Sequence, residues 1–517
     1  MGQKFDFKGL FVLDLANNHQ GNLEHGLRVV REHGAVVRQH GVRAALKFQF
    51  RQLETFIHPD HVAASDNKNV SRFLSTRLDR PAFEAMRDAV RAEGMLTMCT
   101  PFDEDSVDLI VDMGFDILKV ASCSARDWPL LEKISEAGRP VIFSTGGLTI
   151  DQVDDVVSFF DHRGVEFAMM YCVSIYPIPE DEFHLAQIGY MCERYPGRTI
   201  GWSTHETPAE TTAVQIALAQ GAEMFERHVG VATDKITLNA YSSTPQQIDA
   251  WLSAYAHGRR LLGGPVPRAI PAVERESIEA LSRGVYARTR IRAGERIARD
   301  QVYFAMPPAP GALESGEWRD GIVAMRDVSP DQPLDRTSIA VPSDPDWLVL
   351  KHAIHEAKAL LNQARVPLDS EFEVEFSHHY GVPQFRGTGV VIINCINREY
   401  CKKILVQLAG QAHPLHFHKR KEETFQVLHG ILHVTVDGHE RTLRPGETCL
   451  VQPGVWHSFR TDTGCVFEEI STTHYNDDSF YQDKAINRMR RSDRKTVVDH
   501  WGRFQIAPTT AVPGITD

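Results

Sequence analysis

The sequence has no long apolar segment and no surplus of basic residues. None of its apolar runs approaches the roughly 20 residues that a membrane-spanning helix needs, so we expect no membrane association. The N-terminus lacks the charged and then apolar pattern of an export signal, which predicts a cytoplasmic protein. The net charge of -12 argues against a nucleic-acid partner, because phosphate binding requires a basic face.

Paired cysteine spacings are also missing. The eight cysteines are scattered, and several lie within apolar runs that resemble strands. This pattern predicts buried, reduced thiols and argues against a zinc site built from neighbouring cysteines. The chain of 517 residues has no low-complexity tract. It is too long for one hydrophobic core, so we expect roughly two to four domains.

Eight short apolar runs, each followed by a helix-type pattern, occupy the first half of the chain. Near-continuous apolar strands that alternate with helices indicate a parallel sheet. Eight such repeats in about 250 residues predict an α/β fold, a (β/α)8 TIM barrel. The predicted strands are residues 10–15, 44–49, 96–100, 117–121, 141–144, 167–172, 200–203 and 224–228.

Polar residues gather at the carboxyl ends of these runs, where TIM barrels hold their active sites. Lys47 and Lys119, with serines on the same rim, predict an anion site, because lysines supply charge and hydroxyls supply directional hydrogen bonds. So many polar residues on one rim are hard to explain as isolated core groups. They are Lys47, Gln49, Lys119, Ser122, Ser144, Ser203, His205 and His228.

Two of these rim residues are histidines that end the last two strands. His205 and His228 could together hold one divalent metal and leave coordination positions open, as a catalytic metal site requires. A single histidine in this position would more often be a packed core residue. Two histidines beside the two lysines favour metal ligation.

Two smaller modules follow the predicted barrel, which we assign to residues 1–262. Residues 263–342 contain a linker and short β-rich pieces without helix periodicity. Residues 343–517 begin with a helix near 348–364 and continue with closely spaced strands. These strands predict an antiparallel β-barrel.

The barrel sequence resembles the sialic acid synthase family in eight ordered motifs. Residues 283–308 also resemble the antifreeze-like (SAF) domain that follows the barrel in that family. Any one motif would be a weak signal, whereas eight in the family's order are a strong one. The matching segments are DLANNHQG at 14–21, KFQ at 47–49, TPFD at 100–103, KVAS at 119–122, STG at 144–146, YP at 176–177, STH at 203–205 and ERH at 226–228.

This resemblance implies a reaction. Phosphoenolpyruvate would condense with an open-chain sugar aldehyde, and water would add before phosphate leaves. His205 and His228 would hold Mn²⁺ or Mg²⁺ to polarise the aldehyde. The implied catalytic residues are Asp14, Lys47 and Lys119, and the implied substrate-binding residues are Gln49, Ser122, Ser144, Tyr176 and Ser203.

Three charged sugar contacts of that family are replaced in this sequence. Ser124 stands for a glutamate, Asn239 lies where an aspartate is expected, and Met306 stands for the arginine of the antifreeze-like domain. Loss of such contacts changes acceptor choice, because their former hydrogen-bond partners are left unpaired. We therefore expect an acceptor other than N-acetylmannosamine. The alternative is that other residues supply these contacts from misaligned insertions.

The last module carries two motifs that resemble those of cupins. The first is Gly410-x5-His416-x-His418-x4-Glu423-x6-Gly430, and the second contains Pro453-Gly454-x2-His457. In a small β-barrel the three histidines and Glu423 would converge on one divalent metal of unknown identity. His378 and His379 are interpreted as surface residues.

Cupins include isomerases, epimerases and inert binding modules, so three functions remain open. The first is a synthase acting through the barrel, with phosphoenolpyruvate and a sugar aldehyde as partners and, by resemblance, a homodimer. The second is a sugar isomerase or epimerase acting through the cupin, with the barrel a relic. The third is a sugar-binding protein without catalysis.

Overall fold

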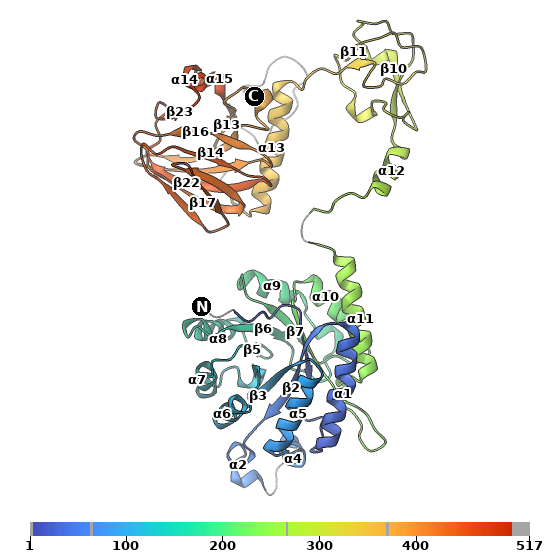
Figure 1. Cartoon of the computed structure of the whole chain (residues 1–517), viewed down its shortest axis with the longest axis vertical. Helices are drawn as coiled ribbons and strands as arrows, with labels where there is room; N and C mark the ends of the chain where they lie inside the picture. The colour runs from blue at the N-terminus through green and yellow to red at the C-terminus, as the bar shows by residue number, and fades with distance from the viewer. Residues whose placement is uncertain (1–3, 63–65, 265–266, 369–371, 499–517) are drawn as a thin grey trace. The chain divides into compact units, whose positions relative to one another are not determined.

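The computed structural model describes residues 4–62, 66–264, 267–368 and 372–498. The chain divides into two compact units, Met1–Ala269 and Ile270–Asp517, each with hydrophobic cores of its own (Figure 1). No helix within the described ranges is long and apolar enough to cross a membrane.

The first unit contains a closed barrel of eight parallel strands, which confirms the predicted TIM-barrel class. Each strand pairs with its sequence neighbours, and β1 pairs with β8 to close the barrel. The strands are β1 (Leu10–Asp14), β2 (Arg43–Phe50), β3 (Leu96–Pro101), β4 (Ile117–Val120), β5 (Val141–Ser144), β6 (Phe167–Cys172), β7 (Ile200–Thr204) and β8 (Met224–His228).

Helices surround these strands, and local sequence fixes where several of them begin and end (Figure 1). The side chain of Asn22 caps the first helix, which ends at Gly41, a glycine in the left-handed conformation with φ 61°. The helices are α1 (Leu23–His40), α2 (Leu53–Phe56), α3 (Pro59–Val62), α4 (Lys68–Ser75), α5 (Arg80–Ala92), α6 (Glu104–Asp112), α7 (Trp128–Glu136), α8 (Ile150–His162), α9 (Ala186–Arg194), α10 (Thr212–Ala219) and α11 (Pro245–Leu262).

Two apolar clusters hold this unit together. The larger cluster packs strand residues against the helices, and the smaller one is formed mainly by residues on the barrel strands. Alternation along β1 places Val12 in the smaller cluster, and Asp14 follows two residues later at the carboxyl end of the strand. Strand alternation thus brings charged side chains to the rim above an apolar floor.

The second unit starts with helix α12 (Ala272–Leu281) and a small β-rich module with its own core. The module contains β9 (Gly284–Ala287) paired with β10 (Val302–Ala305), and β11 (Val323–Ala324) paired with β12 (Ile339–Ala340). The module boundaries drawn from the sequence, at 262 and 342, stay predictions.

The remainder of the second unit is helix α13 (Asp346–Gln363) and two antiparallel sheets, which confirms the predicted β-barrel class. One sheet has seven strands in the order β20-β17-β22-β15-β14-β13-β24, and the other has five in the order β19-β18-β21-β16-β23. The strands are β13 (Glu373–Ser377), β14 (Val390–Asn397), β15 (Tyr400–Gln407), β16 (Ala412–Phe417), β17 (Glu423–Gly430), β18 (Leu432–Val436), β19 (His439–Leu443), β20 (Thr448–Val451), β21 (His457–Arg460), β22 (Cys465–Thr472), β23 (Phe480–Tyr481) and β24 (Lys495–Val498). Two short helices, α14 (Lys484–Arg488) and α15 (Arg491–Arg494), precede the last strand.

Candidate functional site

A buried array of alternating charges lies at the carboxyl ends of the barrel strands. The Lys47 Nζ atom is 3.0 Å from Asp14 Oδ2 and donates to Glu226 Oε1 at 2.8 Å. Lys119 Nζ is 3.6 Å from the other oxygen of Glu226. Strand register explains this grouping, because Asp14 pairs with Lys47 on β2 and with His228 on β8. All four charged side chains are at most 5% exposed.

The charges in this array stabilise one another. Burial lowers the pKa of Lys47, but ionised Asp14 and Glu226 outweigh it and hold that pKa above its ordinary value. Burial likewise favours the neutral acid at Glu226, yet Lys119 and Lys47 hold its pKa well below the usual range. Burial lowers the pKa of Lys119. Two lysines and two carboxylates are therefore paired in this array.

A cradle of small polar groups lies beside Lys119. Its ammonium donates to Ser144 Oγ, and the Ser122 Oγ accepts the backbone N–H of Gly146 at 3.1 Å. A Cβ atom at position 146 would overlap the hydroxyls of Ser122 and Ser174 and force them to move, so glycine here allows the close approach of the three. The cradle offers hydroxyls and a cation together, which suits an oxyanion such as phosphate.

His205 and His228 come together at the same rim, with ring centroids 5.3 Å apart. Because His205 Nδ1 must donate to the Val173 carbonyl at 2.8 Å, its Nε2 is left as an acceptor. The His228 Nδ1 atom lies 3.3 Å from Asp14 Oδ2. Burial lowers the pKa of His228 to about 4 and also lowers that of His205, so both rings are neutral at pH 7. Neutral, oriented rings are suited to metal ligation.

The predicted sugar-facing residues also lie at this rim. Tyr176 is 51% exposed, and its ring centroid is 4.0 Å from that of His205. Arg51 donates to the Gln49 amide oxygen at 2.9 Å. Two cavities open here, of about 330 Å³ beside Gln49 and about 300 Å³ beside His228, and Asn17 lines both. They are large enough for a sugar-sized ligand.

Ser203 also belongs to the charged array rather than standing apart from it, because its Oγ donates to Glu226 Oε1 at 3.2 Å. The structure thus brings together the predicted anion and metal residues of the barrel around one carboxylate. Their roles in binding and catalysis remain predictions.

Two rim residues were missed from the sequence. Glu226 lies at the centre of the array, and its signal was a carboxylate inside the buried strand β8. Arg51 is stacked between Phe73 and Phe102, with its guanidinium carbon 3.9 and 3.8 Å from the two ring centroids. Burial lowers the Arg51 pKa to about 10, so it remains a cation.

The predicted cupin ligands converge in the second unit. Their ligand atoms lie within 4.8 Å of one another, and no other such group of three or more occurs within the described residues. His416 on β16 pairs with His457 on β21. Glu423 begins β17, and His418 follows β16 directly. All four side chains, His416, His418, Glu423 and His457, are buried.

The orientation of these side chains fits a metal ion. His457 Nε2 and Glu423 Oε1 are 2.7 Å apart, yet both are buried and neither has a hydrogen-bond partner among the described residues. Each of the three histidines uses Nδ1 to donate to a backbone carbonyl, which leaves Nε2 as an acceptor. The carbonyls that accept from His416, His418 and His457 are those of Pro414, Asp478 and Val455, at 2.9, 2.7 and 3.1 Å respectively. A set of three imidazoles and one carboxylate suits a divalent transition metal.

The interpretation of His378 and His379 as surface residues is wrong. Their exposed fractions are 3% and 0%. His379 Nε2 lies 3.0 Å from the Tyr481 hydroxyl, and its ring packs against His413 with centroids 4.6 Å apart. Sequence alternation could not reveal this, because the pair follows the end of β13 rather than lying within it.

Comparisons with known proteins identify the barrel. Residues 36–265 match the NeuB family model. A crystal structure of a putative spore coat polysaccharide biosynthesis protein E from Chromobacterium violaceum is 40% identical, with a TM-score of 0.62, over 65% of this chain and 100% of that one. The chain belongs to the NeuB family.

Two further proteins similar to this chain carry names of sugar-acid or polysaccharide synthesis. The mouse N-acetylneuraminate-9-phosphate synthase is 25% identical over 56% of this chain and 81% of its own. The Bacillus subtilis spore coat polysaccharide biosynthesis protein SpsE is 26% identical over 65% of this chain and 94% of its own. Residues 404–469 match the cupin domain family. The chain is thus a member of the sialic and nonulosonic acid synthase family with a cupin domain added.

Proposed function

We propose that the barrel condenses phosphoenolpyruvate with an open-chain sugar aldehyde to give a nonulosonic acid and phosphate. The observation that carries this proposal is the joint placement of a lysine–serine cradle and a histidine pair around Glu226. The cradle suits a phosphorylated anion, and the histidine pair suits a metal that activates a carbonyl.

In this proposal Lys119 and the serine cradle bind the phosphate group, and Lys47 binds the carboxylate of phosphoenolpyruvate. Lys47 is held by Asp14 and Glu226, so its ammonium is oriented before the substrate arrives. C3 of phosphoenolpyruvate forms the new bond to the aldehyde carbon, water adds at C2, and the C2–O bond to phosphate breaks.

His205 and His228 would hold the divalent metal, most suitably Mn²⁺ or Mg²⁺, which supplies Lewis acidity to the aldehyde oxygen. Asp14 is the proposed proton acceptor for the water that attacks C2. Its Oδ1 accepts the Ala16 N–H at 3.0 Å, and its Oδ2 faces Lys47 and His228. The carboxylate is thereby fixed in orientation.

We propose an acceptor other than N-acetylmannosamine. Ser124 is buried where the resembling family has a glutamate, while Met306 is 58% exposed. Arg51 adds a cation beside Gln49 in the cavity next to the rim. Replacing a carboxylate and adding a guanidinium would favour an acceptor with a different charge pattern. A homodimer is proposed from the family resemblance alone, and the cytoplasmic location stays a prediction from the sequence.

The test is phosphate release from phosphoenolpyruvate by the purified full chain, with Mn²⁺ or with chelator, across aldoses and N-acylated amino sugars. Metal-dependent release with one preferred acceptor supports the proposal, and N-acetylmannosamine as best acceptor contradicts the acceptor part. No release from folded, metal-loaded protein would favour the cupin as the principal active site, with the barrel a relic.

A further inference from the structure

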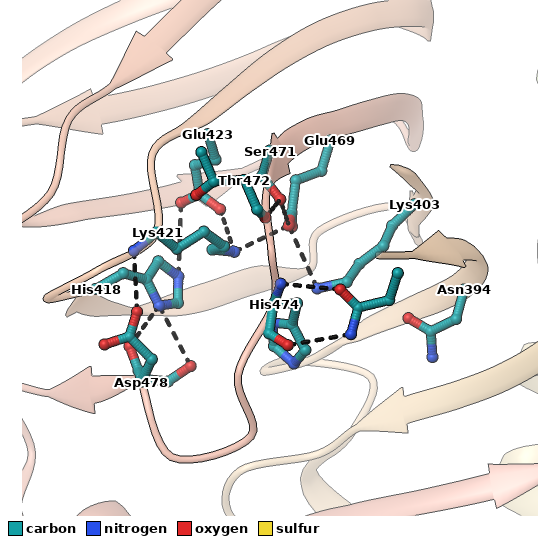
Figure 2. Close-up of polar contacts among 12 residues, drawn as sticks. Asn394, Lys403, His418, Lys421, Glu423, Glu469, Ser471, Thr472, His474 and Asp478 are labelled. Atoms are coloured by element: carbon teal, nitrogen blue, oxygen red, sulfur yellow. Dashed lines mark hydrogen bonds and ion pairs between the residues drawn. The ribbon is translucent and has the colours of Figure 1, made fainter. Parts of the chain in front are cut away.

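The cupin buries more charge than a metal site requires. Lys421 lies between two carboxylates: its ammonium contacts Glu423 and donates to Glu469 Oε1 at 2.9 Å (Figure 2). Lys403 donates to the same Glu469 oxygen at 3.3 Å, and so does Ser471 Oγ at 3.3 Å. These four charged side chains are at most 5% exposed. A continuous array therefore runs from the metal ligands to Lys403.

Strand register places this array on one inner face. Lys403 on β15 pairs directly with Glu469 on β22, and Glu423 on β17 pairs with Ser471. Side chains two residues apart on a strand share a face, so Glu469 and Ser471 point the same way. The neighbouring pair Lys402 and Glu468 makes a separate ion pair at 2.9 Å, in which the lysine is 46% exposed.

Stability alone does not explain such an array. Two ion pairs out of water carry a desolvation cost of several kcal/mol per ion, and apolar replacements of equal size are often neutral or stabilising. The strands around it supply an apolar core that includes Phe425, Phe459 and Phe467. Buried charges that cost stability within an apolar core indicate that their role is to bind a ligand.

The charge balance indicates the sign of that ligand. Two lysines and two carboxylates are paired in the structure, so their formal charges cancel. A divalent cation on the three histidines and Glu423 adds two positive charges in a buried space. Lys403 carries three N–H donors, and among the described residues the side-chain acceptor it reaches is Glu469. Both features favour an anion with further acceptor oxygens.

The alternation of donors and acceptors indicates the rest of the ligand. Ammonium, carboxylate and hydroxyl groups lie side by side, and a sugar hydroxyl can donate and accept in the same place. His474 adjoins Lys403, Lys421 and Glu469, and its buried Nδ1 has no hydrogen-bond partner among the described residues (Figure 2). A chain of hydroxyl groups would meet partners along the whole array.

We propose that the cupin is a second ligand site that binds a sugar acid, a polyhydroxylated 2-oxo or 2-hydroxy carboxylate. The carboxylate and its neighbouring oxygen would bind the metal held by the three histidines and Glu423. The hydroxyl groups would contact Lys403, Glu469 and Ser471. This inference goes beyond the proposed function and requires no activity of the barrel. The nonulosonic acid proposed as the barrel product belongs to the same chemical class.

The test is calorimetric binding of D-gluconate and of D-glucitol, a neutral polyol of equal chain length, to the Mn²⁺-loaded full chain. A Lys119→Met, His205→Ala background removes the cation of the barrel cradle and a ligand of the proposed barrel metal, so the signal reports on the cupin. We expect one gluconate per chain and at least about 100-fold weaker binding of glucitol, because a buried charge-assisted contact is worth about 3 kcal/mol. No gluconate binding, or equal binding of glucitol, overturns the proposal.

A matched pair of lysine variants sharpens the test. Lys403→Met is expected to weaken gluconate binding about 10-fold or more, whereas Lys402→Met, on the same strand, changes it less than about twofold. Mn²⁺ binding, read by electron paramagnetic resonance, should stay unchanged in both. If Lys403→Met fails to fold, Lys403→Met with Glu469→Gln removes the pair together and should show the same weakening. Equal affinities in the Lys402 and Lys403 variants overturn the assignment, whatever phosphate release the barrel shows.

Discussion

The barrel rim and the cupin interior bury the same set of charges on unrelated folds. Each site alternates two lysines with two carboxylates and places histidines beside them. The two sites differ in their histidines. Among the described residues, only the cupin histidines converge with a carboxylate to form a group of three or more candidate metal ligands. The barrel set is Asp14, Lys47, Lys119, Glu226, His205 and His228, and the cupin set is Glu423, Glu469, Lys403, Lys421, His416, His418 and His457.

This difference separates two uses of a balanced ion array. In the cupin four side chains could coordinate the metal, and the proposed sugar acid would occupy the remaining coordination positions. In the barrel two histidines leave more positions open, and the serine cradle provides a separate place for an anion. In both cases the array pairs buried lysines with carboxylates, while the surrounding groups decide what binds.

The largest predicted effect on activity follows from replacing Lys119, the lysine of the barrel cradle. Lys119→Met should lower phosphate release about 1000-fold or more, because it deletes a buried cation aimed at the substrate phosphate. Steady-state phosphate release with the best acceptor measures this. Lys133→Met, on α7 with a partly exposed ion pair to Asp108, is the control and should stay within about twofold. A Lys119 variant with normal activity would place the reaction elsewhere.

The next effect is on stability and concerns the cupin array. Glu469→Gln leaves Lys403 and Lys421 without a shared carboxylate, which should cost about 3 to 5 kcal/mol of unfolding free energy. Urea unfolding at pH 7.5 of the metal-free protein measures it.

The matched control for this loss is the exposed pair, where Glu468→Gln should cost less than about 1 kcal/mol. Adding Lys403→Met to Glu469→Gln should restore most of the lost stability, since an unpaired cation is removed. If the double variant is less stable than Glu469→Gln, the array is not held by this pairing.

A smaller effect separates the two metal sites. His457→Ala should weaken metal binding in the cupin about 100-fold, because it removes a ligand whose Nε2 has no other described partner. Metal content after dialysis, together with Mn²⁺ titration, measures this, and phosphate release should be retained. His205→Ala should do the reverse. Loss of both metals in either variant would show that the two sites are not independent.

Sequence reasoning was most successful where one pattern repeats. Eight apolar runs followed by helices predicted the barrel, because burial on both faces of a parallel sheet imposes that pattern. The candidate metal ligands of the cupin were found from motif spacing: His416 lies on β16, and His418 follows that strand directly. Fixed spacing on regular elements is information that a sequence carries directly.

The paired charges could not be assigned in the same way. Lys402 and Lys403 are adjacent, as are Glu468 and Glu469, so strand alternation requires one of each pair to point inward but does not say which. Only the register of β15 with β22 decides that Lys403 and Glu469 face the interior. Glu226 was given no role from the sequence, because His228 was taken as the functional residue of the ERH motif at 226–228. Long-range pairing, absent from local sequence, supplied these residues.

The smallest predicted effect is a pH dependence that both sites should share. Burial lowers the pKa of His418 and of His228 to about 4, from an ordinary 6.5. The unfolded chain therefore takes up protons first, so stability present above pH 6.5 is lost as the pH falls toward 4. Between pH 7.5 and 5.5 each histidine should cost about 1 kcal/mol of unfolding free energy in metal-free protein. Urea unfolding after chelator treatment should show this loss reduced by that amount in His418→Gln and in His228→Gln. Equal losses in wild type and variants would mean that neither ring resists protonation. Bound metal should keep the loss in wild type and extend it to lower pH, because it holds the rings neutral in the folded chain while the unfolded chain still takes up protons.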